Sequence, residues 1–416
     1  MKIMITGSGG REHALAAAFL QNKRVENVYC IPGNGGTEDL DRCENVELSA
    51  ITDIVRFASE EKIDLVMPGS EASLVEGIAD RLQEAGIKVF GPRKNAAMLE
   101  GSKAFAKDFM KKYGIRTAGY RSFTDFKTAM EYAEKCPLPA VVKADGLAAG
   151  KGVIICRTGD DIRNALTLMM IDKAFGSSGE KVVIEEFLEG FEASIHCFFD
   201  GETFVPLLSA KDHKKIGEGE TGPNTGGMGV VVPNPGMSEE LWADFTSSIL
   251  EPTKKGLLSE DLRFSGVIFF GLMIQNGKCS LLEYNMRMGD PETQGMLAML
   301  ESDFTSLVEA AVSGELSNTE VRWKDGSACC VVLASRGYPG KYETGFKISG
   351  IPEVTNSAVH PAGMKKIDGI PVTSGGRVLS IVSNGHSLFE ARKRCYREVE
   401  KVSFEGMTFR KDIGLL

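Results

Sequence analysis

Short apolar runs alternate with helical patterns along the first hundred residues. Each of the runs Ile3–Ile5, Val28–Ile31, Leu65–Met67 and Val89–Phe90 is followed closely by a turn rich in glycine or proline. Strands that alternate with helices in this way predict parallel β-α-β units. We therefore predict a doubly wound parallel sheet here. Ligands of such sheets bind beyond the carboxyl ends of the strands, where the glycine turns fall.

The pattern changes in the middle of the chain. Residues 102–120 predict a helical segment, and 191–316 predict a strand-rich region with a long polar loop at Asp212–Gly229. Between them we predict a compact unit with the strands Ala140–Lys143, Val153–Cys156 and Val182–Glu185 and the helix Asp160–Met170. The tail predicts the strands Cys330–Ala334 and Arg377–Ser383 and then a helix from Ser387 to Val402.

Composition places the chain among globular proteins. Its 416 residues carry a formal net charge of −9, with 43% hydrophobic and 25% charged residues, which argues against disordered and fibrous architectures. The acidic balance argues against a nucleic-acid-binding protein, because such binding depends on Lys and Arg. The 47 glycines are roughly 11% of the chain, against an average of about 7%. We expect this surplus where the backbone turns sharply or approaches a ligand closely.

The nine cysteines and the apolar runs bear on the cellular compartment. No two cysteines form a C-x-x-C pair, so the spacing of a zinc or dithiol site is missing. Most lie in apolar surroundings, as Cys156, Cys329 and Cys330 do, where a buried thiol is expected. The sequence shows no signal-peptide pattern and no apolar run of about 18 residues. We therefore expect a cytoplasmic protein without a membrane partner.

The first glycine turn, 7–10, resembles the dinucleotide-binding fingerprint but fails it. Its sixth position is Glu12, where the fingerprint has glycine. The turn still offers backbone N–H groups at the start of a helix, which is a suitable place for a phosphate. A plain tight turn is the alternative.

The segment Lys143–Gly152 is the densest candidate for a phosphate site. It is not a Walker A loop, because three residues separate Gly146 from Gly150 and because Gly152 follows Lys151 instead of Ser or Thr. A flexible glycine flap with two lysines can close over a polyphosphate and neutralise its charge. An ordinary hairpin with solvated lysines is the alternative.

Two later segments end apolar strands in polar residues. Glu185 and Glu186 end the first, and adjacent strand residues face opposite sides, so at most one points into a given cleft. A carboxylate there suits the ribose hydroxyls of a nucleotide, whereas an edge strand with solvated acids is the alternative. In the second segment, Glu283, Asn285 and Arg287 fall on one face by the two-residue period of a strand.

A carboxylate and an amide oxygen side by side, as at Glu283 and Asn285, suit Mg²⁺ that is shared with substrate phosphates. Arg287 can hold an anionic, phosphorylated intermediate bidentately. Buried polar residues that pair with one another are the alternative. Earlier in the chain, His213 beside Asp212 suggests a histidine base, and a solvated loop histidine is the alternative. The glycine-rich segment 221–229 is either a substrate loop or a disordered connector.

Taken together, these segments resemble the ATP-grasp superfamily and, within it, the phosphoribosylamine–glycine ligase family. The motifs TGPNTGGMG at 221–229 and N-x-R-x-GDPET at 285–293 are highly specific. The resemblance runs nearly end to end. Its other carriers are Gly7–Leu15, Phe90–Pro92, Leu99–Phe105, Lys143–Gly152, Ile184–Leu188, Asp212–Lys214, Gly337–Gly340, Gly375–Val378 and Arg410–Gly414. The chain departs from the family pattern at Ser73, where the family has proline, and at Met364, where it has threonine.

The resemblance implies a multidomain α/β and α+β structure with the ATP-grasp fold. A doubly wound N-terminal domain is expected at 1–101, on the substrate side, and a central domain at 102–120 and 188–325. A small ATP flap domain at 121–187 and a β-rich C-terminal domain at 326–416 complete the expected division.

The resemblance also implies a reaction, a step of de novo purine biosynthesis. ATP, glycine and 5-phosphoribosylamine would give glycinamide ribonucleotide, ADP and phosphate through a glycyl phosphate. Mg²⁺ or Mn²⁺ on Glu283 and Asn285 would neutralise charge as the phosphoryl group moves. The partners would be these small molecules, with no nucleic acid or membrane, and we expect a monomer.

Residue roles follow from the same resemblance. Lys143, Asp212 and Arg287 would be catalytic, with Arg287 stabilising the glycyl phosphate and Asp212 orienting the reacting amine. ATP would be bound by Lys103, Lys143, Gly146, Gly150, Lys151, Gly152, Glu185, Glu186, Phe187 and Leu188. Phosphoribosylamine would be positioned by Gly9, Gly10, Arg11, Glu12, Glu71 and Asp290. Closure of the flap would exclude water from the acyl phosphate.

Two other functions share part of this pattern. A carboxylating ATP-grasp enzyme that uses bicarbonate would keep the ATP and metal residues but activate a different acid. A nucleotide-binding protein without catalysis would keep the fold alone, and the set Glu283, Asn285 and Arg287 argues against it. Release of ADP with glycine or with bicarbonate distinguishes the two enzymes, and no release with every substrate present would indicate the binding protein.

Overall fold

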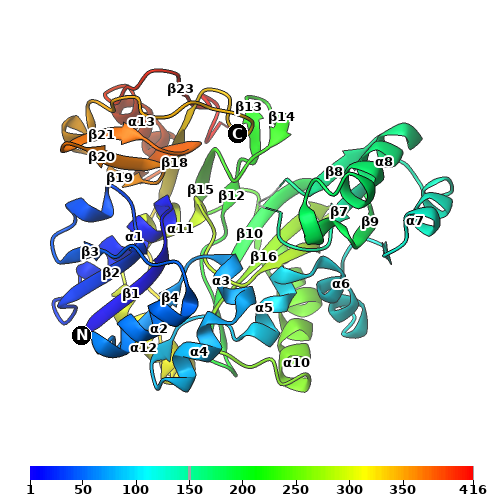
Figure 1. The fold of residues 1–416 in the computed structure, drawn as a ribbon, viewed down its shortest axis with the longest axis horizontal. Coiled ribbons are helices and arrows are strands. Elements are labelled where there is room, and N and C mark those ends of the chain that lie inside the picture. Colours follow the sequence, from blue (N-terminus) through cyan, green and yellow to red (C-terminus); the bar gives the residue numbers. More distant parts are fainter. Residues whose placement is uncertain (149–150, 416) are drawn as a thin grey trace.

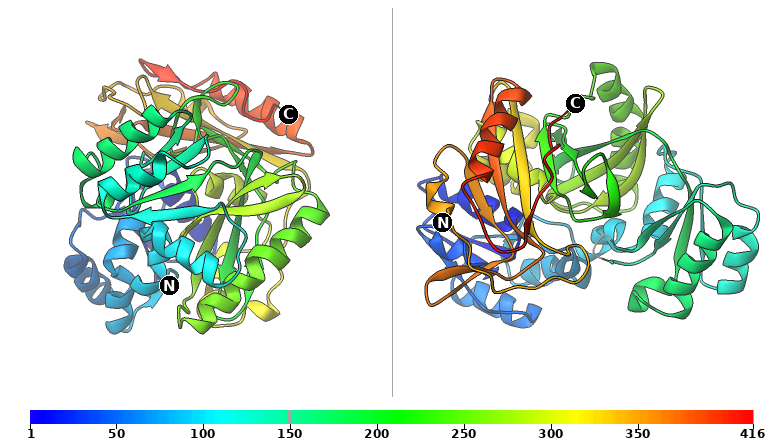
Figure 2. Two further views of the ribbon diagram at one scale, coloured as in Figure 1. Left: turned by 90° about the vertical axis from the view of Figure 1, so that its right-hand side faces the viewer. Right: turned by 90° about the horizontal axis from the view of Figure 1, so that it is seen from above.

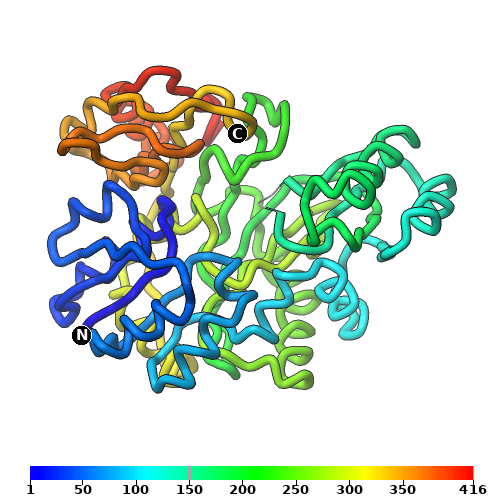
Figure 3. Tube along the Cα trace, in the orientation of Figure 1, coloured from blue at the N-terminus to red at the C-terminus, as the bar shows by residue number. Residues whose placement is uncertain are grey.

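The structure is a computed structural model that describes residues 1–148 and 151–415. Three parts surround a central region: a sheet near the N-terminus, a sheet near the C-terminus, and a small unit that projects to the right in Figure 1. The view from above in Figure 2 shows the same unit lying to one side of the rest. The trace in Figure 3 shows the first segments of the chain beside its last quarter. No helix in the described residues is long and apolar enough to cross a membrane.

The N-terminal sheet is parallel throughout, in the order β3-β2-β1-β4-β5. Its strands are β1 (Lys2–Gly7), β2 (Asn27–Pro32), β3 (Cys43–Asn45), β4 (Leu65–Pro68) and β5 (Lys88–Val89). Its helices are α1 (Gly10–Leu20), α2 (Ile51–Glu60), α3 (Glu71–Glu76) and α4 (Ile78–Glu84). Ile3 and Ile5 pack in the core that contains α1, whereas Met4 packs in the core that contains α2 and α4. Both faces are therefore covered, which confirms the predicted doubly wound sheet.

The projecting unit is an antiparallel sheet in the order β6-β9-β7-β8 with two helices. Its elements are β6 (Tyr120–Phe123), α7 (Phe126–Ala133), β7 (Ala140–Ala144), β8 (Val153–Cys156), α8 (Gly159–Leu166) and β9 (Val182–Glu186). The predicted helix 102–120 is shorter, because α6 (Lys103–Lys112) ends before Gly114, which has a positive φ of 69°. Helix α5 (Lys94–Gly101) leads into α6.

The central region holds an antiparallel sheet in the order β11-β10-β16-β17. Its strands are β10 (Phe191–Phe199), β11 (Phe204–Pro206), β16 (Gly266–Gln275) and β17 (Lys278–Asn285). The prediction of a mainly strand-rich region was incomplete, because the region also contains the helices α9 (Glu239–Phe245), α10 (Glu251–Ser259), α11 (Glu292–Met299) and α12 (Phe304–Val312). Leu241 and Phe245 of α9 and Leu257 of α10 pack on the buried face of this sheet.

The predicted loop Asp212–Gly229 is largely a β-hairpin. Strands β13 (Lys215–Gly217) and β14 (Thr221–Asn224) pair antiparallel. The chain reverses between them because Gly219 and Glu220 both take positive φ angles, 64° and 57°. The prediction of a loop was therefore wrong for most of this stretch. Of the two alternatives for 221–229, the connector without structure is wrong, and the substrate loop stays a prediction.

The C-terminal sheet runs in the order β12-β15-β18-β22-β19. Its strands are β12 (Lys211–Asp212), β15 (Gly229–Val232), β18 (Ser327–Ser335), β19 (Ala358–Pro361) and β22 (Arg377–Gly385), with β23 (Met407–Thr408) paired to β18. Helix α13 (Leu388–Val399) packs on this sheet, and β20 (Met364–Ile367) pairs with β21 (Ile370–Thr373). Because β12 and β15 precede residue 326, this sheet crosses the expected domain boundary there. The domain division stays a prediction.

Candidate active site

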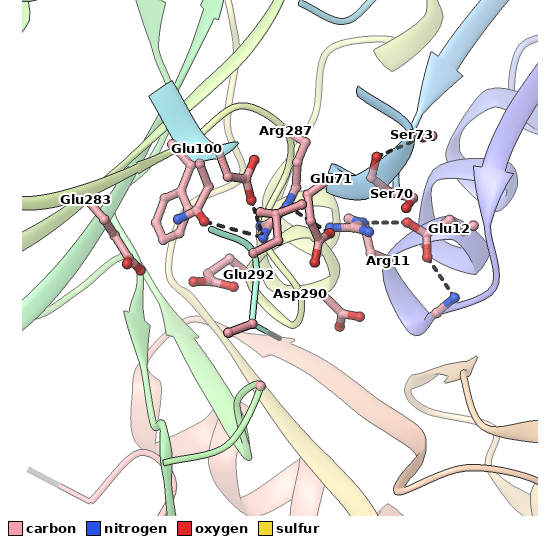
Figure 4. Close-up of a pocket in the computed structure, with 18 of the residues that line it drawn as sticks. Arg11, Glu12, Ser70, Glu71, Ser73, Glu100, Glu283, Arg287, Asp290 and Glu292 are labelled. Atoms are coloured by element: carbon pink, nitrogen blue, oxygen red, sulfur yellow. Dashed lines mark hydrogen bonds and ion pairs between the residues drawn. The ribbon is translucent and has the colours of Figure 1, made fainter. Parts of the chain in front are cut away.

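A cavity of about 970 Å³ opens where the N-terminal sheet, the central sheet and the projecting unit meet. It brings together the following residues that the sequence suggested: Gly9, Arg11, Glu12, Glu71, Lys103, Lys151, Glu185, Asp212, Glu283, Asn285, Arg287 and Asp290. Figure 4 shows the acidic and basic side chains of its interior. The lining does not include Gly10, Lys143, Gly146, Gly152, Glu186, Phe187 or Leu188 among the described residues. Gly150 lies outside the described residues.

The first glycine turn is built around Glu12. The Gly9 N–H donates to Glu12 Oε2 at 2.7 Å, and Arg11 Nε donates to Glu12 Oε1 at 2.5 Å. A Cβ atom on Gly7 would lie 2.6 Å from the carboxyl carbon of Glu12, and one on Gly69 would also collide with this side chain. The Gly9 N–H that we expected to be available to a phosphate is therefore used within the turn.

Arg287 joins three polar side chains just beyond the end of β17. Its Nη2 atom lies 2.8 Å from Glu100 Oε1 and 3.3 Å from Asn285 Oδ1, and its Nε atom lies 3.7 Å from Glu71 Oε2. The predicted face of the strand therefore ends at Asn285. Arg287 lies beyond the strand and contacts the Asn285 side chain through a hydrogen bond. Burial raises the pKa of Glu100 more strongly than Arg287 lowers it, whereas the pKa of Glu71 is held below its usual value despite burial. Sequence reasoning missed Glu100.

Glu283 and Asn285 lie at the end of β17 and line the cavity. Burial would raise the pKa of Glu283, but Lys214 and Lys143 hold it below its usual value, so the carboxylate is ionised at neutral pH. No group of three or more His, Cys, Asp or Glu side chains in the described part of the chain could hold a metal. A single carboxylate beside an amide oxygen fits a Mg²⁺ ion that takes its other ligands from phosphates and water.

Glu185 is enclosed by two lysines. Its side chain is 2% exposed, and its Oε2 atom lies 2.9 Å from Lys107 Nζ and 3.0 Å from Lys143 Nζ. Glu186 faces the other way, as the alternation of a strand predicts, and accepts the Gly119 N–H at 3.1 Å. Of the Glu185 carboxylate that we expected to meet ribose hydroxyls, the Oε2 atom is thus paired with two cations, whereas the Oε1 atom has no hydrogen-bond partner among the described residues. Lys107 was missed, although its place one turn after Lys103 on α6 was a usable signal.

Asp290 is tied to the C-terminal sheet by Arg377. The guanidinium donates to the Asp290 backbone oxygen at 2.7 Å and to Asp290 Oδ2 at 3.1 Å, and it also donates to the Gly226 oxygen at 2.7 Å. Burial would raise the pKa of Asp290, but Arg377 and Arg11 hold it below its usual value. Sequence reasoning used Arg377 only as part of a family motif and did not place it at the site.

His213 does not take the position expected of a base beside Asp212. Its ring is buried, with 4% exposure, and is not part of the cavity lining in the described residues. Nδ1 lies 3.0 Å from Glu220 Oε1 and 3.4 Å from Arg410 Nη2. The predictions of a catalytic base and of a solvated loop residue are therefore both wrong for His213. Its ring instead joins the β13–β14 hairpin to the C-terminal segment.

A cavity with a carboxylate–amide pair, lysines and a projecting antiparallel unit defines the class of this protein, which is an ATP-grasp ligase. Family models agree over most of the chain. Those described as Phosphoribosylglycinamide synthetase match in three parts: the N domain at residues 1–100, the ATP-grasp (A) domain at 101–293 and the C domain at 328–416. The chain belongs to the phosphoribosylglycinamide synthetase family.

Relatives of similar length support the same assignment. Proteins named phosphoribosylamine–glycine ligase from Clostridium acetobutylicum and Fusobacterium nucleatum are 51% and 49% identical, each over 100% of this chain and 99% of the relative. The crystal structure of the ligase of that name from Thermotoga maritima has a TM-score of 0.88 at 35% identity, covering 99% of this chain and 100% of that one. A biotin carboxylase domain from Hydrogenobacter thermophilus shares the fold, with a TM-score of 0.75 at 17% identity over 98% of this chain and 91% of that one.

Proposed function

We propose that this chain ligates glycine to 5-phosphoribosylamine with ATP, giving glycinamide ribonucleotide, ADP and phosphate through a glycyl phosphate. Membership of the family and the names of its relatives support this reaction. One cavity is lined both by Glu283 and Asn285, which suit phosphate-bound metal, and by Arg11, Glu71 and Asp290 on the N-terminal side. This juxtaposition of a phosphate side and a second substrate side in one cavity carries the proposal.

On the phosphate side, ATP would bind between the projecting unit and the central sheet. Lys103 and Lys151 line this part of the cavity and would neutralise phosphate charge. Glu283 and Asn285 would hold Mg²⁺ or Mn²⁺, which, when bound, neutralises charge on the transferred phosphoryl group. Lys143 would act through Glu185, whose carboxylate it fixes at 3.0 Å.

On the substrate side, Arg287 would hold the carboxylate of glycine while it is phosphorylated, because its guanidinium lies beside Asn285. Glu71 and Asp290 would position the ribose of phosphoribosylamine, with Arg11 nearby. The amine would attack the acyl phosphate carbonyl, and phosphate would leave, so no nucleophile from the protein is needed. A flap that closes over the cavity would exclude water from the acyl phosphate.

Production of ADP in a coupled assay tests the proposal, with each substrate omitted in turn. We expect ADP release that requires ATP, glycine and phosphoribosylamine together, and no release when bicarbonate replaces glycine. Release with bicarbonate would favour a carboxylating enzyme, and no release with every substrate present would contradict ligation. A monomeric, cytoplasmic enzyme without a nucleic-acid partner also remains our prediction, and light scattering after size-exclusion chromatography tests its oligomeric state.

A further inference from the structure

Two cysteines of the N-terminal sheet lie next to each other. The Sγ atom of Cys43 is 3.7 Å from that of Cys30, and Cys43 is half-buried whereas Cys30 is buried. All nine cysteines belong to the described residues, and Cys136 is the only other one that is half-buried. The Cys136 thiol donates to the Ala133 backbone oxygen at 3.4 Å instead of to a second thiol. Cys43 therefore combines access to solvent with a neighbouring thiol.

The strand that carries Cys43 is short and lies at an edge. Cys43 begins β3, which has three residues and pairs with β2 alone among the described strands. In the parallel register Cys43 lies opposite Val28 and Cys30 opposite Asn45, so the two cysteines are diagonal neighbours on one face. An S–S bond is about 2.05 Å long, so the sulfur atoms have to approach before they can bond. An edge strand held on one side only can supply this movement.

The two thiols differ in how easily they lose their protons. The hydrogen bond from Cys30 lowers the pKa of Cys43, although burial and Glu44 oppose this fall. The same hydrogen bond, together with burial, raises the pKa of Cys30. The thiolate is the nucleophilic form of cysteine, so Cys43 is the thiol that reacts first with a dissolved oxidant. Cys30 keeps its proton until a reactive sulfur forms beside it.

We propose that a hydroperoxide converts Cys43 and Cys30 into a disulfide. The Cys43 thiol first gives its proton to water, and the thiolate then attacks hydrogen peroxide, which breaks the O–O bond and forms a sulfenic acid. The hydroxide that leaves takes up the proton that Cys43 gave to the solvent and becomes water. Cys30 then attacks the Cys43 sulfur and breaks its S–O bond, and this second hydroxide takes the Cys30 proton and also becomes water. Two thiols are thus oxidised by two electrons, and one peroxide is reduced to two waters.

The link would hold β3 in a displaced position and so affect the loop that β3 supports. The Asn45 side chain on β3 donates to the Asn34 backbone oxygen at 2.8 Å and accepts the Thr37 hydroxyl at 2.6 Å. Asn34 and Asn45 border a second cavity, of about 450 Å³, that also includes Asp290. Because Asp290 is proposed to position phosphoribosylamine, oxidation should impair the use of this substrate. This consequence, unlike the disulfide itself, rests on the proposed function.

Peptide mass spectrometry of the full chain after treatment with hydrogen peroxide tests the disulfide. We expect a Cys30–Cys43 linked peptide, lighter by two hydrogens than the two reduced peptides, in the wild type and in the matched control Cys136→Ser. Cys43→Ser should lack the link and keep Cys30 reduced. Cys30→Ala should stop at the sulfenic acid of Cys43, which dimedone traps as an adduct. Circular dichroism before oxidation checks that each variant is folded.

Three results would overturn the proposal. The first is sulfinic acid at Cys43 in the wild type without any link, because Cys30 would then not reach the oxidised sulfur. The second is oxidation of Cys30 in Cys43→Ser, which would contradict the order of the two steps. The third is modification of Cys136 while Cys43 stays reduced, because exposure and not the neighbouring thiol would then decide reactivity.

Release of ADP by the oxidised protein tests the effect on the cavity. We expect kcat/KM for phosphoribosylamine to fall about 10-fold in the oxidised wild type, the KM for ATP to stay within about twofold, and dithiothreitol to reverse the fall. Peroxide should leave the kinetics of Cys43→Ser unchanged. A linked protein with unchanged kinetics, or an equal fall in Cys43→Ser, would contradict the coupling between β3 and the cavity. Failure of the untreated wild type to release ADP would contradict the proposed function itself, whereas the linked peptide tests the disulfide independently of that function.

Discussion

Glu185→Gln removes the negative charge between two buried lysines and should strongly destabilise the fold. The side chains of Glu185 and Lys107 are each 2% exposed and that of Lys143 is 8% exposed, so water cannot replace the carboxylate. Burial already lowers the pKa of Lys107 from 10.5 to about 8 with Glu185 in place. This fall corresponds to roughly 3 kcal/mol at neutral pH. Loss of one member of a buried ion pair costs about 3–5 kcal/mol, and we expect that range here.

Lys107→Met is the matched variant. It removes the cation with the lowered pKa but leaves the Lys143–Glu185 pair at 3.0 Å, so it should destabilise the protein less than Glu185→Gln does. Unfolding by urea and by heat at pH 7, followed by circular dichroism, gives the loss of folding stability of both variants on one scale. An equal or smaller loss in Glu185→Gln would refute this account of the buried charges.

The same lysine gives the pH dependence a definite sign. The folded pKa of Lys107, about 8, lies below its ordinary value of 10.5, so the unfolded chain binds more protons between these values. This contribution to stability is therefore present above pH 10.5 and is lost as the pH falls through 8. The wild type should gain stability between pH 8 and 10 relative to Lys107→Met, and parallel pH profiles for the two proteins would contradict this.

Glu283→Ala should abolish ADP release and leave the circular dichroism spectrum intact, and unchanged release would remove the metal assignment. Arg377→Ala should lower kcat/KM for phosphoribosylamine about 10- to 100-fold, because Asp290 loses two charge-assisted hydrogen bonds. The KM for ATP should stay unchanged, and an equally large rise in the KM for ATP would refute this prediction. Burial lowers the pKa of His13 from 6.5 to about 4 and that of His360 from 6.5 to about 3. The contribution of these two neutral histidines to the stability of the fold is therefore fully present above pH 6.5 and is lost as the pH falls through 4 and 3. His13→Gln should therefore lose less stability than the wild type between pH 6.5 and 4, and an unchanged acid profile would contradict this role.

The N-terminal sheet could be predicted from the sequence because its pattern is local. Consecutive buried residues such as Ile3–Ile5 identify a strand covered on both faces, and the turns after the strands follow from glycine and proline. Helix α9 was missed although Leu241 and Phe245 have helical spacing, because the strands on either side dominated the pattern. The β13–β14 hairpin was missed because its strands are polar and short, and backbone pairing needs no apolar signal.

The site could be predicted only where a motif places its residues. Glu283 and Asn285 are two positions apart, so the period of a strand brings them together. Glu100 and Lys107 lie in helices and look like solvated charges in the sequence, yet each contacts a residue far along the chain: Glu100 pairs with Arg287 and Lys107 with Glu185. The helical spacing of Lys103 and Lys107 could have placed both lysines on one face of α6, but a single sequence does not identify their partners, because the pairs depend on how separate elements pack.

Several glycines of the site have a more specific cause than close approach to phosphate. Gly7 and Gly9 lie against the Glu12 carboxylate, Gly227 against Asp212 and Gly289 against Glu292, and at each of these glycines a Cβ would come within 3 Å of the acidic side chain. Bare backbone lets these carboxylates sit in a crowded interior, where only hydrogen bonds and cations can stabilise their charge. Glu12 receives both from the protein itself, from Gly9 and Arg11. Asp212 and Glu292 have no ion pair with the described residues, and Glu292 instead accepts a hydrogen bond from Ser194 Oγ at 3.3 Å. The same glycine packing therefore leaves these two carboxylates less closely neutralised than Glu12.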